Sequence, residues 1–415
     1  MATLLSIQEA EPPLPHAPSW SAFLELGFRP VYLAGALWAL IAVGLWIFAP
    51  HWLDGPLAGV AWHAHEMLWG FVATIAVGFL MTAGAAWTGI NPVQGRALAI
   101  LCALWLVARL GFLAGDGTPF LIATLAELLF FALAAAALLR AVVVSRNARN
   151  YGVPVLLLAL GVSDALFLLA AHDGDYALLM RQFNAGLLIM TLIALLVARR
   201  VIPFFATRAV PGLQIPMQLR SGHIQLGASG IAVVCLLADL PIAQALALAV
   251  AGVLSLQHWV SWKPQAVLRK PLLWILYLGY LSLGVGLLLA AASVAGFGAR
   301  PALHIHVIAM GGFSLLIIGM ITRTALGHLG RPLDADRSMV ASYGLVIAAT
   351  VLRLLALQPS AAALHLLHVA ALLWVAAFAL YLWRFVPMMI RPRADRPAPA
   401  AAPVATPVTI VRPWH

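Results

Sequence analysis

Two apolar stretches of the sequence each begin with a pair of histidines separated by one residue. The first pair is His63 and His65, followed at once by Glu66, and the second is His304 and His306. Neutral imidazole is a common ligand for iron, copper and zinc, and haem b needs an axial histidine in many proteins. The pairs therefore point to a metal ion or a haem held between helices.

The spacing limits what each pair can bind. Residues two apart on an ideal helix point about 200° apart, so His63 and His65 cannot both face one metal ion unless that turn is unwound. We expect one histidine of each pair to be an inward ligand and the other to serve a second site. By contrast, His365 and His368 are three residues apart on one helix face and could share a metal ion. Met310, one turn after His306, is either a soft copper ligand or a core residue.

The elements that must position these residues are membrane-spanning helices. Of the 415 residues, 63% are hydrophobic and only 9% are charged, whereas soluble domains carry about 25% charged residues. Runs of about 20 apolar residues recur along the chain, and they lack the alternation of a β-barrel strand. The sequence predicts an all-α polytopic membrane protein of about twelve spans, near residues 30–49, 62–83, 97–114, 118–139, 153–171, 176–199, 222–238, 241–260, 272–294, 302–323, 337–356 and 361–384.

The basic residues predict the orientation. Of 24 lysines and arginines, 20 fall in the terminal segments and the even-numbered loops, three within spans, and only Arg300 in an odd-numbered loop. Because cytoplasmic loops are enriched in basic residues, we expect both termini in the cytoplasm of a bacterial inner-membrane protein. The excess of positive charge thus reflects topology and contact with membrane lipid, not nucleic acid. Residues 1–29 form a cytoplasmic segment, 30–386 the membrane domain and 387–415 a disordered tail in this prediction.

Helix direction also predicts depth. Arg109, Arg181 and Arg353 lie within spans, and each falls in the outer half of the membrane. The two histidine pairs lie at the same level, as do His51, His172, His365 and His368. Single histidines at helix ends more often bond water or lipid headgroups, which is the simpler interpretation of His51, His172 and His365.

Ionisable groups in hydrocarbon are costly unless they are paired or bound. Haem propionates would pair well with buried arginines. Glu66, Glu127 and Asp164 are the carboxylates near this level. Glu127 and Asp164 could belong to a proton path, or they could only neutralise Arg109 or Arg181.

Several motifs, in the same order, resemble the NnrS family. They are WHAHEMLWGF, GFLMT and AWTG near residues 62–89, ARRVIPFF near 198–205, LLWILYLGY at 272–280, and HVIAMGG with MITRTALGHLGRPL from 306 to 333. The resemblance implies a twelve-helix bacterial membrane protein that binds haem and copper and acts in the response to nitric oxide. The matching positions are His63, His65, Glu66, Arg200, His306, Arg323, His328 and Arg331.

The sequence departs from the family pattern at two positions. Ala86 stands where the pattern has asparagine, and Tyr277 stands where it has histidine. If that histidine is a cofactor ligand elsewhere in the family, this chain has three alternatives. It binds less metal, it binds the metal through a tyrosinate, or His304 is the ligand instead.

Three functions fit these features. The first is an oxidoreductase that reduces nitric oxide to nitrous oxide at a haem–copper site near the outer face, with electrons from a separate donor. The second is a non-enzymatic haem or copper protein that scavenges or senses nitric oxide or handles the metal. The third is a secondary transporter, for which we expect matching broken helices in the two halves; Gly311-Gly312 has no such counterpart.

Roles follow for the first function. His65 and His306 are predicted axial haem ligands, and Arg109, Arg181 and Arg353 would bind the propionates. A copper set would comprise His63, His304, His365 and His368. Glu66 and Asp164 would relay protons.

Overall fold

A computed structural model describes residues 17–297 and 300–395, and every regular element in these ranges is a helix. The elements are α1 (Trp20–Phe23), α2 (Phe28–Phe48), η1 (Pro50–Trp52), α3 (Val60–His65), η2 (Glu66–Ala73), α4 (Thr74–Thr88), α5 (Gly95–Leu113), α6 (Thr118–Val144), η3 (Ala148–Asn150), α7 (Gly152–Asp173), α8 (Tyr176–Ala209), α9 (Leu219–Leu237), α10 (Pro241–Ser261), η4 (Pro264–Val267), α11 (Pro271–Val294), α12 (Pro301–His306), η5 (Val307–Ser314), α13 (Leu315–His328), α14 (Arg337–Ala356) and α15 (Ala363–Met389).

Within these ranges, eleven helical segments are long and apolar enough to cross a membrane, which confirms the predicted polytopic helical fold. The remaining predicted span, 222–238, is the 19-residue helix α9, which does not meet the hydropathy criterion that the eleven segments meet. Its first half carries polar side chains, some of which form hydrogen bonds inside the bundle. Gln225, for example, donates to Ser255 and Tyr280 at 2.7 and 2.9 Å. Internal hydrogen bonds of this kind make a polar helix compatible with the interior of a membrane protein.

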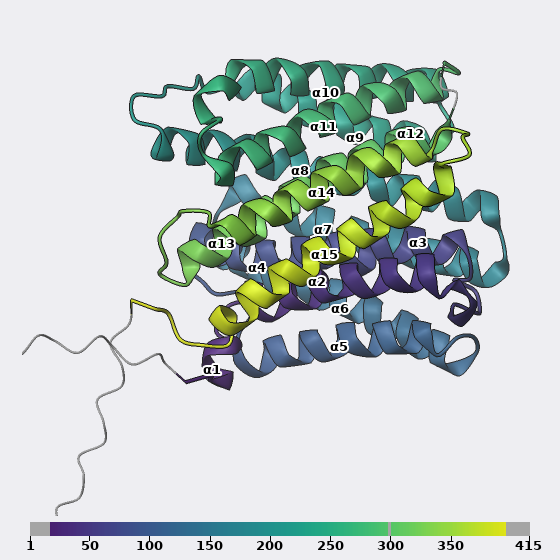
Figure 1. Cartoon of the computed structure of the whole chain (residues 1–415), viewed down its shortest axis with the longest axis horizontal. Coiled ribbons are helices and arrows are strands. Elements are labelled where there is room, and N and C mark those ends of the chain that lie inside the picture. The colour runs from purple at the N-terminus through teal and green to yellow at the C-terminus, as the bar shows by residue number, and fades with distance from the viewer. Residues whose placement is uncertain (1–16, 298–299, 396–415) are drawn as a thin grey trace, which may run out of the picture.

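The long helices lie roughly side by side, and most neighbours in the chain are antiparallel because their loops are short (Figure 1). Helix α10 packs on α9 and α11, and α14 packs on α15. Contacts between distant segments close the bundle, since α15 packs on α2, and η2 meets η5 near the centre.

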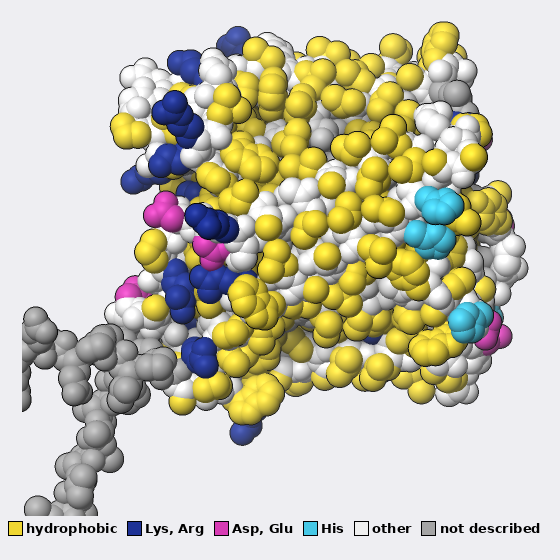
Figure 2. Space-filling view, viewed as in Figure 1, with side chains coloured by type: hydrophobic (Ala, Val, Ile, Leu, Met, Phe, Trp, Pro, Cys, Tyr) yellow, Lys and Arg dark blue, Asp and Glu magenta, His cyan; other side chains and the backbone are white. Residues whose placement is uncertain are grey.

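The two ends of the bundle differ in their charged side chains. Figure 2 shows Lys and Arg gathered at one end, His at the other, and an apolar band between them. This arrangement confirms the predicted segregation of basic residues from histidines. We call the two ends the arginine end and the histidine end; which one faces the cytoplasm remains a prediction.

The first long helix begins before the predicted span, and the last one ends after it. Helix α2 begins at Phe28, and α15 continues through Pro387 to Met389. Arg29, expected in the cytoplasmic segment, is buried and donates to the carbonyl oxygens of Met389 and Arg391 at 3.1 and 2.6 Å. It therefore ties the start of the first long helix to the end of the last. The tail predicted to be disordered lies outside the described residues from 396 onward.

Candidate functional site

Two continuous helical spans carry the histidine pairs, and both contain a π-helical segment. The first histidine helix comprises α3, η2 and α4, and the second comprises α12, η5 and α13. In each case the π segment starts directly after the second histidine, at Glu66 or Val307. Because π turns are uncommon and occur most often at functional sites, their presence at both places marks this region.

A hydroxyl group supports each of these wide turns. Thr74 Oγ1 donates to the carbonyl oxygen of Trp69 at 3.2 Å, and Ser314 Oγ donates to that of Ala309 at 2.9 Å. Both bonds reach five residues back along the helix. The two π segments are also in contact with each other, so the helices meet where their backbones are widened.

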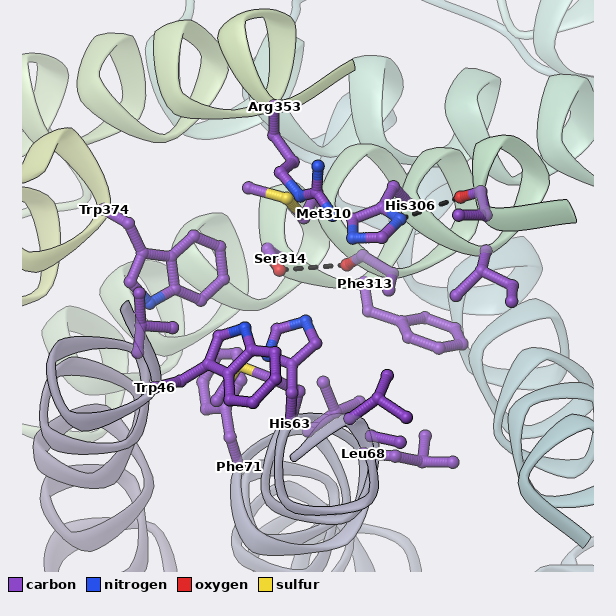
Figure 3. A pocket seen from close by; sticks show the side chains of 18 of the residues that line it. Trp46, His63, Leu68, Phe71, His306, Met310, Phe313, Ser314, Arg353 and Trp374 are labelled. Atoms are coloured by element: carbon purple, nitrogen blue, oxygen red, sulfur yellow. Dashed lines mark hydrogen bonds between the residues drawn. The ribbon is translucent and has the colours of Figure 1, made fainter. Parts of the chain in front are cut away.

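His63 and His306 face each other across this contact. Their ring centroids lie 6.3 Å apart with 19° between the ring planes. Trp46 stacks on the other side of His63, with centroids 5.6 Å apart and 14° between planes (Figure 3). His306 Nδ1 lies 2.8 Å from the carbonyl oxygen of Ala302. A carbonyl can only accept, so Nδ1 is the donor and the neutral ring keeps its lone pair on Nε2.

Both imidazoles line a cavity of about 310 Å³, which is at the lower end of the range for small-molecule sites. Its wall is mostly apolar and includes Trp46, Met310 and Trp374 (Figure 3). Arg353 also lines it, and no carboxylate pairs with this guanidinium among the described residues. The cavity thus combines two facing imidazoles, one cation and an apolar wall.

A second group of polar side chains lies on the other side of the first histidine helix. His65 is fully buried, and its Nδ1 donates to Glu66 Oε1 at 2.8 Å. Its Nε2 lies 3.0 Å from Asp164 Oδ1 and 3.3 Å from Glu127 Oε2. Arg109 forms ion pairs with both Glu66 and Glu127. We call these five residues the His65 cluster.

Aromatic rings enclose the His65 cluster. The Trp38 indole donates to Glu66, and Phe112 and Phe167 pack against the His65 ring at centroid distances of 5.0 and 5.7 Å. Exclusion of water by such rings strengthens the electrostatic interactions inside the cluster.

The lack of a side chain at Gly70 leaves room for the His65 cluster to pack. A Cβ atom at Gly70 would lie 2.9 Å from Trp38 Nε1 and even closer to Arg109 and Glu66. We expect Gly70→Ala to destabilise the protein by about 1–3 kcal/mol, because crowded cores do not accept extra atoms. The matched control is Gly44→Ala, since a Cβ at Gly44 meets nothing within 4 Å. Thermal unfolding in detergent would check this, and equal midpoints for the two variants would contradict it.

The structure places the two histidines of each pair in different surroundings, and the partners differ from those predicted. His63, not His65, faces His306, so the predicted axial pair of His65 and His306 does not match the geometry. The reason is rotational: the helix turns His65 toward Asp164, on the side away from the cavity. His304 lines a different, smaller pocket beside Asn184 and Ser293.

The four histidines predicted to bind copper are not brought together. His365 is exposed, and His368 stacks on Phe48 with ring centroids 5.7 Å apart. Neither of these two histidines lines the cavity. Among the described residues, the one group of three or more potential ligands close enough for a metal ion is His65, Glu127 and Asp164.

The three arginines also separate. Arg353 lies at the cavity, whereas Arg109 is held within the His65 cluster and Arg181 donates to the carbonyl oxygen of Leu237 at the end of α9. Of the three predicted propionate partners, only Arg353 is therefore placed to meet a ligand in the cavity.

Sequence reasoning considered Glu127 for a proton path or as the partner of an arginine, but it gave Glu127 no ligand role. A lone carboxylate in the middle of the 27-residue apolar helix α6 was the available signal. Trp46 and Trp38 were also missed, because interfacial and core tryptophans look alike in sequence.

The remaining family positions lie nearer the arginine end. Arg323 lies over the Phe205 ring at 4.0 Å, and Arg200 donates to Asn150 Oδ1 at 2.8 Å. Tyr277 donates to the carbonyl oxygen of Trp262 at 3.0 Å, and neither Tyr277 nor Ala86 lines the cavity. The two departures from the family pattern thus leave the facing histidines unchanged.

Comparison with known proteins agrees with this set of motifs. The family model described as NnrS protein matches residues 22–393, which is most of the chain. No curated protein matches it. The matched region contains both histidine helices, the cavity and the His65 cluster, and the chain therefore belongs to the NnrS family.

Proposed function

We propose that this protein binds haem b in the cavity between His63 and His306 and reduces nitric oxide there. The observation that carries the proposal is the pair of imidazoles facing each other from two helices, 6.3 Å apart at their centroids. Metal–imidazole bonds are about 2.0–2.1 Å long for zinc, so two rings at this separation would reach one metal atom when each turns a ring nitrogen toward it. Membership of the NnrS family connects the chain with the nitric oxide response.

The donor set fits a haem. The bond from His306 Nδ1 to Ala302 leaves Nε2 free as a ligand atom, which is the usual arrangement for a metal-bound histidine. Arg353 supplies a cation without a carboxylate partner among the described residues, suited to a propionate. The apolar wall suits the macrocycle and would exclude water. We assign no copper to the four predicted histidines, because they do not converge.

His63 and His306 would hold the haem, which would supply the redox chemistry. The reaction consumes two nitric oxide molecules, two electrons and two protons and yields nitrous oxide and water. The chain's own residues would hold the group, neutralise its carboxylates and admit an apolar gas, while the electrons come from a separate donor. Glu66 and Asp164 lie across the helix from the cavity, and their proton-relay role stays a prediction.

The protein is a multi-pass membrane protein, and we propose the bacterial inner membrane with both termini in the cytoplasm. The histidine end would then face the periplasm, because the basic residues gather at the opposite end (Figure 2).

The test uses the purified full chain in detergent. We expect a reduced-minus-oxidised spectrum of haem b and formation of nitrous oxide from nitric oxide when a chemical reductant is supplied. Haem without nitrous oxide would favour the non-enzymatic alternative of scavenging or sensing, since both functions need the same ligands. Absence of haem after expression with haem supplied would refute the proposal.

A further inference from the structure

The His65 cluster contains more carboxylate than its own cations can balance, and its donor atoms converge. We propose that His65, Glu127 and Asp164 bind a divalent transition-metal ion at a site separate from the cavity. This inference does not depend on haem in the cavity, since its ligands lie on the opposite side of the first histidine helix.

The distances suit a metal ion. His65 Nε2 lies 3.0 Å from Asp164 Oδ1 and 3.3 Å from Glu127 Oε2, and one ligand atom from each residue lies within 4.8 Å of the others. Ligand atoms bound tetrahedrally at about 2.0–2.2 Å are about 3.3–3.6 Å apart. Small movements of buried side chains would therefore complete the site.

The orientation of His65 supports the same conclusion. Its Nδ1 donates to Glu66 Oε1 at 2.8 Å, and its Nε2 faces two carboxylates, with Asp164 Oδ1 at hydrogen-bond distance. A neutral ring in this tautomer would turn its lone pair toward both carboxylates, so the arrangement needs a cation there, either a proton on Nε2 or a metal ion between the carboxylates. A ligating histidine whose other nitrogen donates to a carboxylate is the common pattern at metal sites. Trp38 and Arg109 hold Glu66 in this supporting position.

Two oxygen atoms point to a missing ligand. Glu127 Oε2 and Asp164 Oδ2 have no hydrogen bond within the described structure, although both residues are at most 2% exposed. A buried carboxylate oxygen without a partner is costly. A metal ion beside His65 Nε2 would relieve both carboxylates at once.

Charge decides the type of ion. Glu66, Glu127 and Asp164 carry three negative charges and Arg109 one positive charge, so the cluster has a net charge of −2 when His65 is neutral. One divalent ion neutralises it, whereas a monovalent ion leaves one charge unbalanced. The ligands are one nitrogen and carboxylate oxygens without sulfur, which favours zinc, manganese or iron(II) over copper(I). Two bound protons are the competing way to reach neutrality.

The test is metal analysis of the full-length protein. Wild type, Glu127→Gln and Asp164→Asn would be purified in detergent, incubated with Zn²⁺ or Mn²⁺ and desalted. We expect about one ion per wild-type chain and at least about tenfold less in each variant, because ligand loss weakens metal sites strongly. The control is Asp173→Asn, which changes an exposed carboxylate at the end of α7 and should retain the ion.

A second measurement protects against variants that fail to fold. Wild-type protein incubated with Co²⁺ should show visible absorption typical of nitrogen and oxygen ligands in a four- or five-coordinate site. Haem is counted separately, so a missing haem does not affect this result. Wild type that binds none of these ions, or variants that bind as much as wild type, would overturn the proposal and favour protons in the cluster.

Discussion

Replacing His306 with alanine is expected to lower the haem content of the purified protein at least about tenfold, since losing even a supporting group costs 10- to 100-fold in metal affinity. His63→Ala should have a similar effect, because the two rings face the same point from separate helices. Haem per chain is measured by the pyridine haemochrome method. Added imidazole should partly restore the spectrum of His306→Ala, which a merely structural role would not explain.

The controls come from the same motifs. His304→Ala changes the other member of the pair, which lines a different pocket, and His365→Ala changes an exposed histidine. Both should keep wild-type haem content. If His63→Ala and His306→Ala retain haem while His65→Ala loses it, the facing pair is not the haem site and the original prediction of His65 as a ligand would be revived.

Replacing Arg109 with methionine is expected to have the largest effect on stability. The change leaves Glu66 and Glu127 without their buried counter-charge. Removing one partner of a buried ion pair typically costs about 3–5 kcal/mol, because the remaining charge stays desolvated. We expect a large fall in the unfolding midpoint in detergent and a low yield of monodisperse protein.

The matched control is Arg181→Met. This arginine also lies within a span, but it donates only to a backbone carbonyl near the bundle surface. The double variant Arg109→Met with Glu127→Gln should recover part of the lost stability, since one uncompensated charge is removed. An Arg109→Met protein as stable as Arg181→Met would show that the cluster does not need this guanidinium.

The spanning helices and the level of the polar residues could be predicted from the sequence. The apolar runs predicted the helices. The alternating direction of the helices predicted that His63, His306 and Arg353 lie at one depth. The separate roles of the two histidines in a pair also followed from helix geometry. These predictions needed only the rise and turn of a helix.

The face to which each histidine points could not be predicted. The two-residue spacing predicts the angle between His63 and His65. Which of the two histidines faces His306 depends on how the helix is rotated against its neighbours. That rotation is set by packing of residues such as Trp46 and Phe167, which lie far away in the chain. The His65 cluster needed the same long-range information, because its members come from four separate helical spans. Similarly, His365 and His368 share a face, but only the fold shows that neither of them lines the cavity.

The π-helical segments add a constraint on chain length. A π turn contains one residue more than the α-helical turn it replaces, so deleting a residue within Glu66–Ala73 would allow regular hydrogen bonding. The cost would be a rotation of about 100° between the parts on either side. His63 would then leave the cavity and His65 would leave its carboxylates, while Thr74–Thr88 kept its packing. These two helices can therefore accept a substitution far more easily than the insertion or deletion of a residue. Loops do not have this restriction.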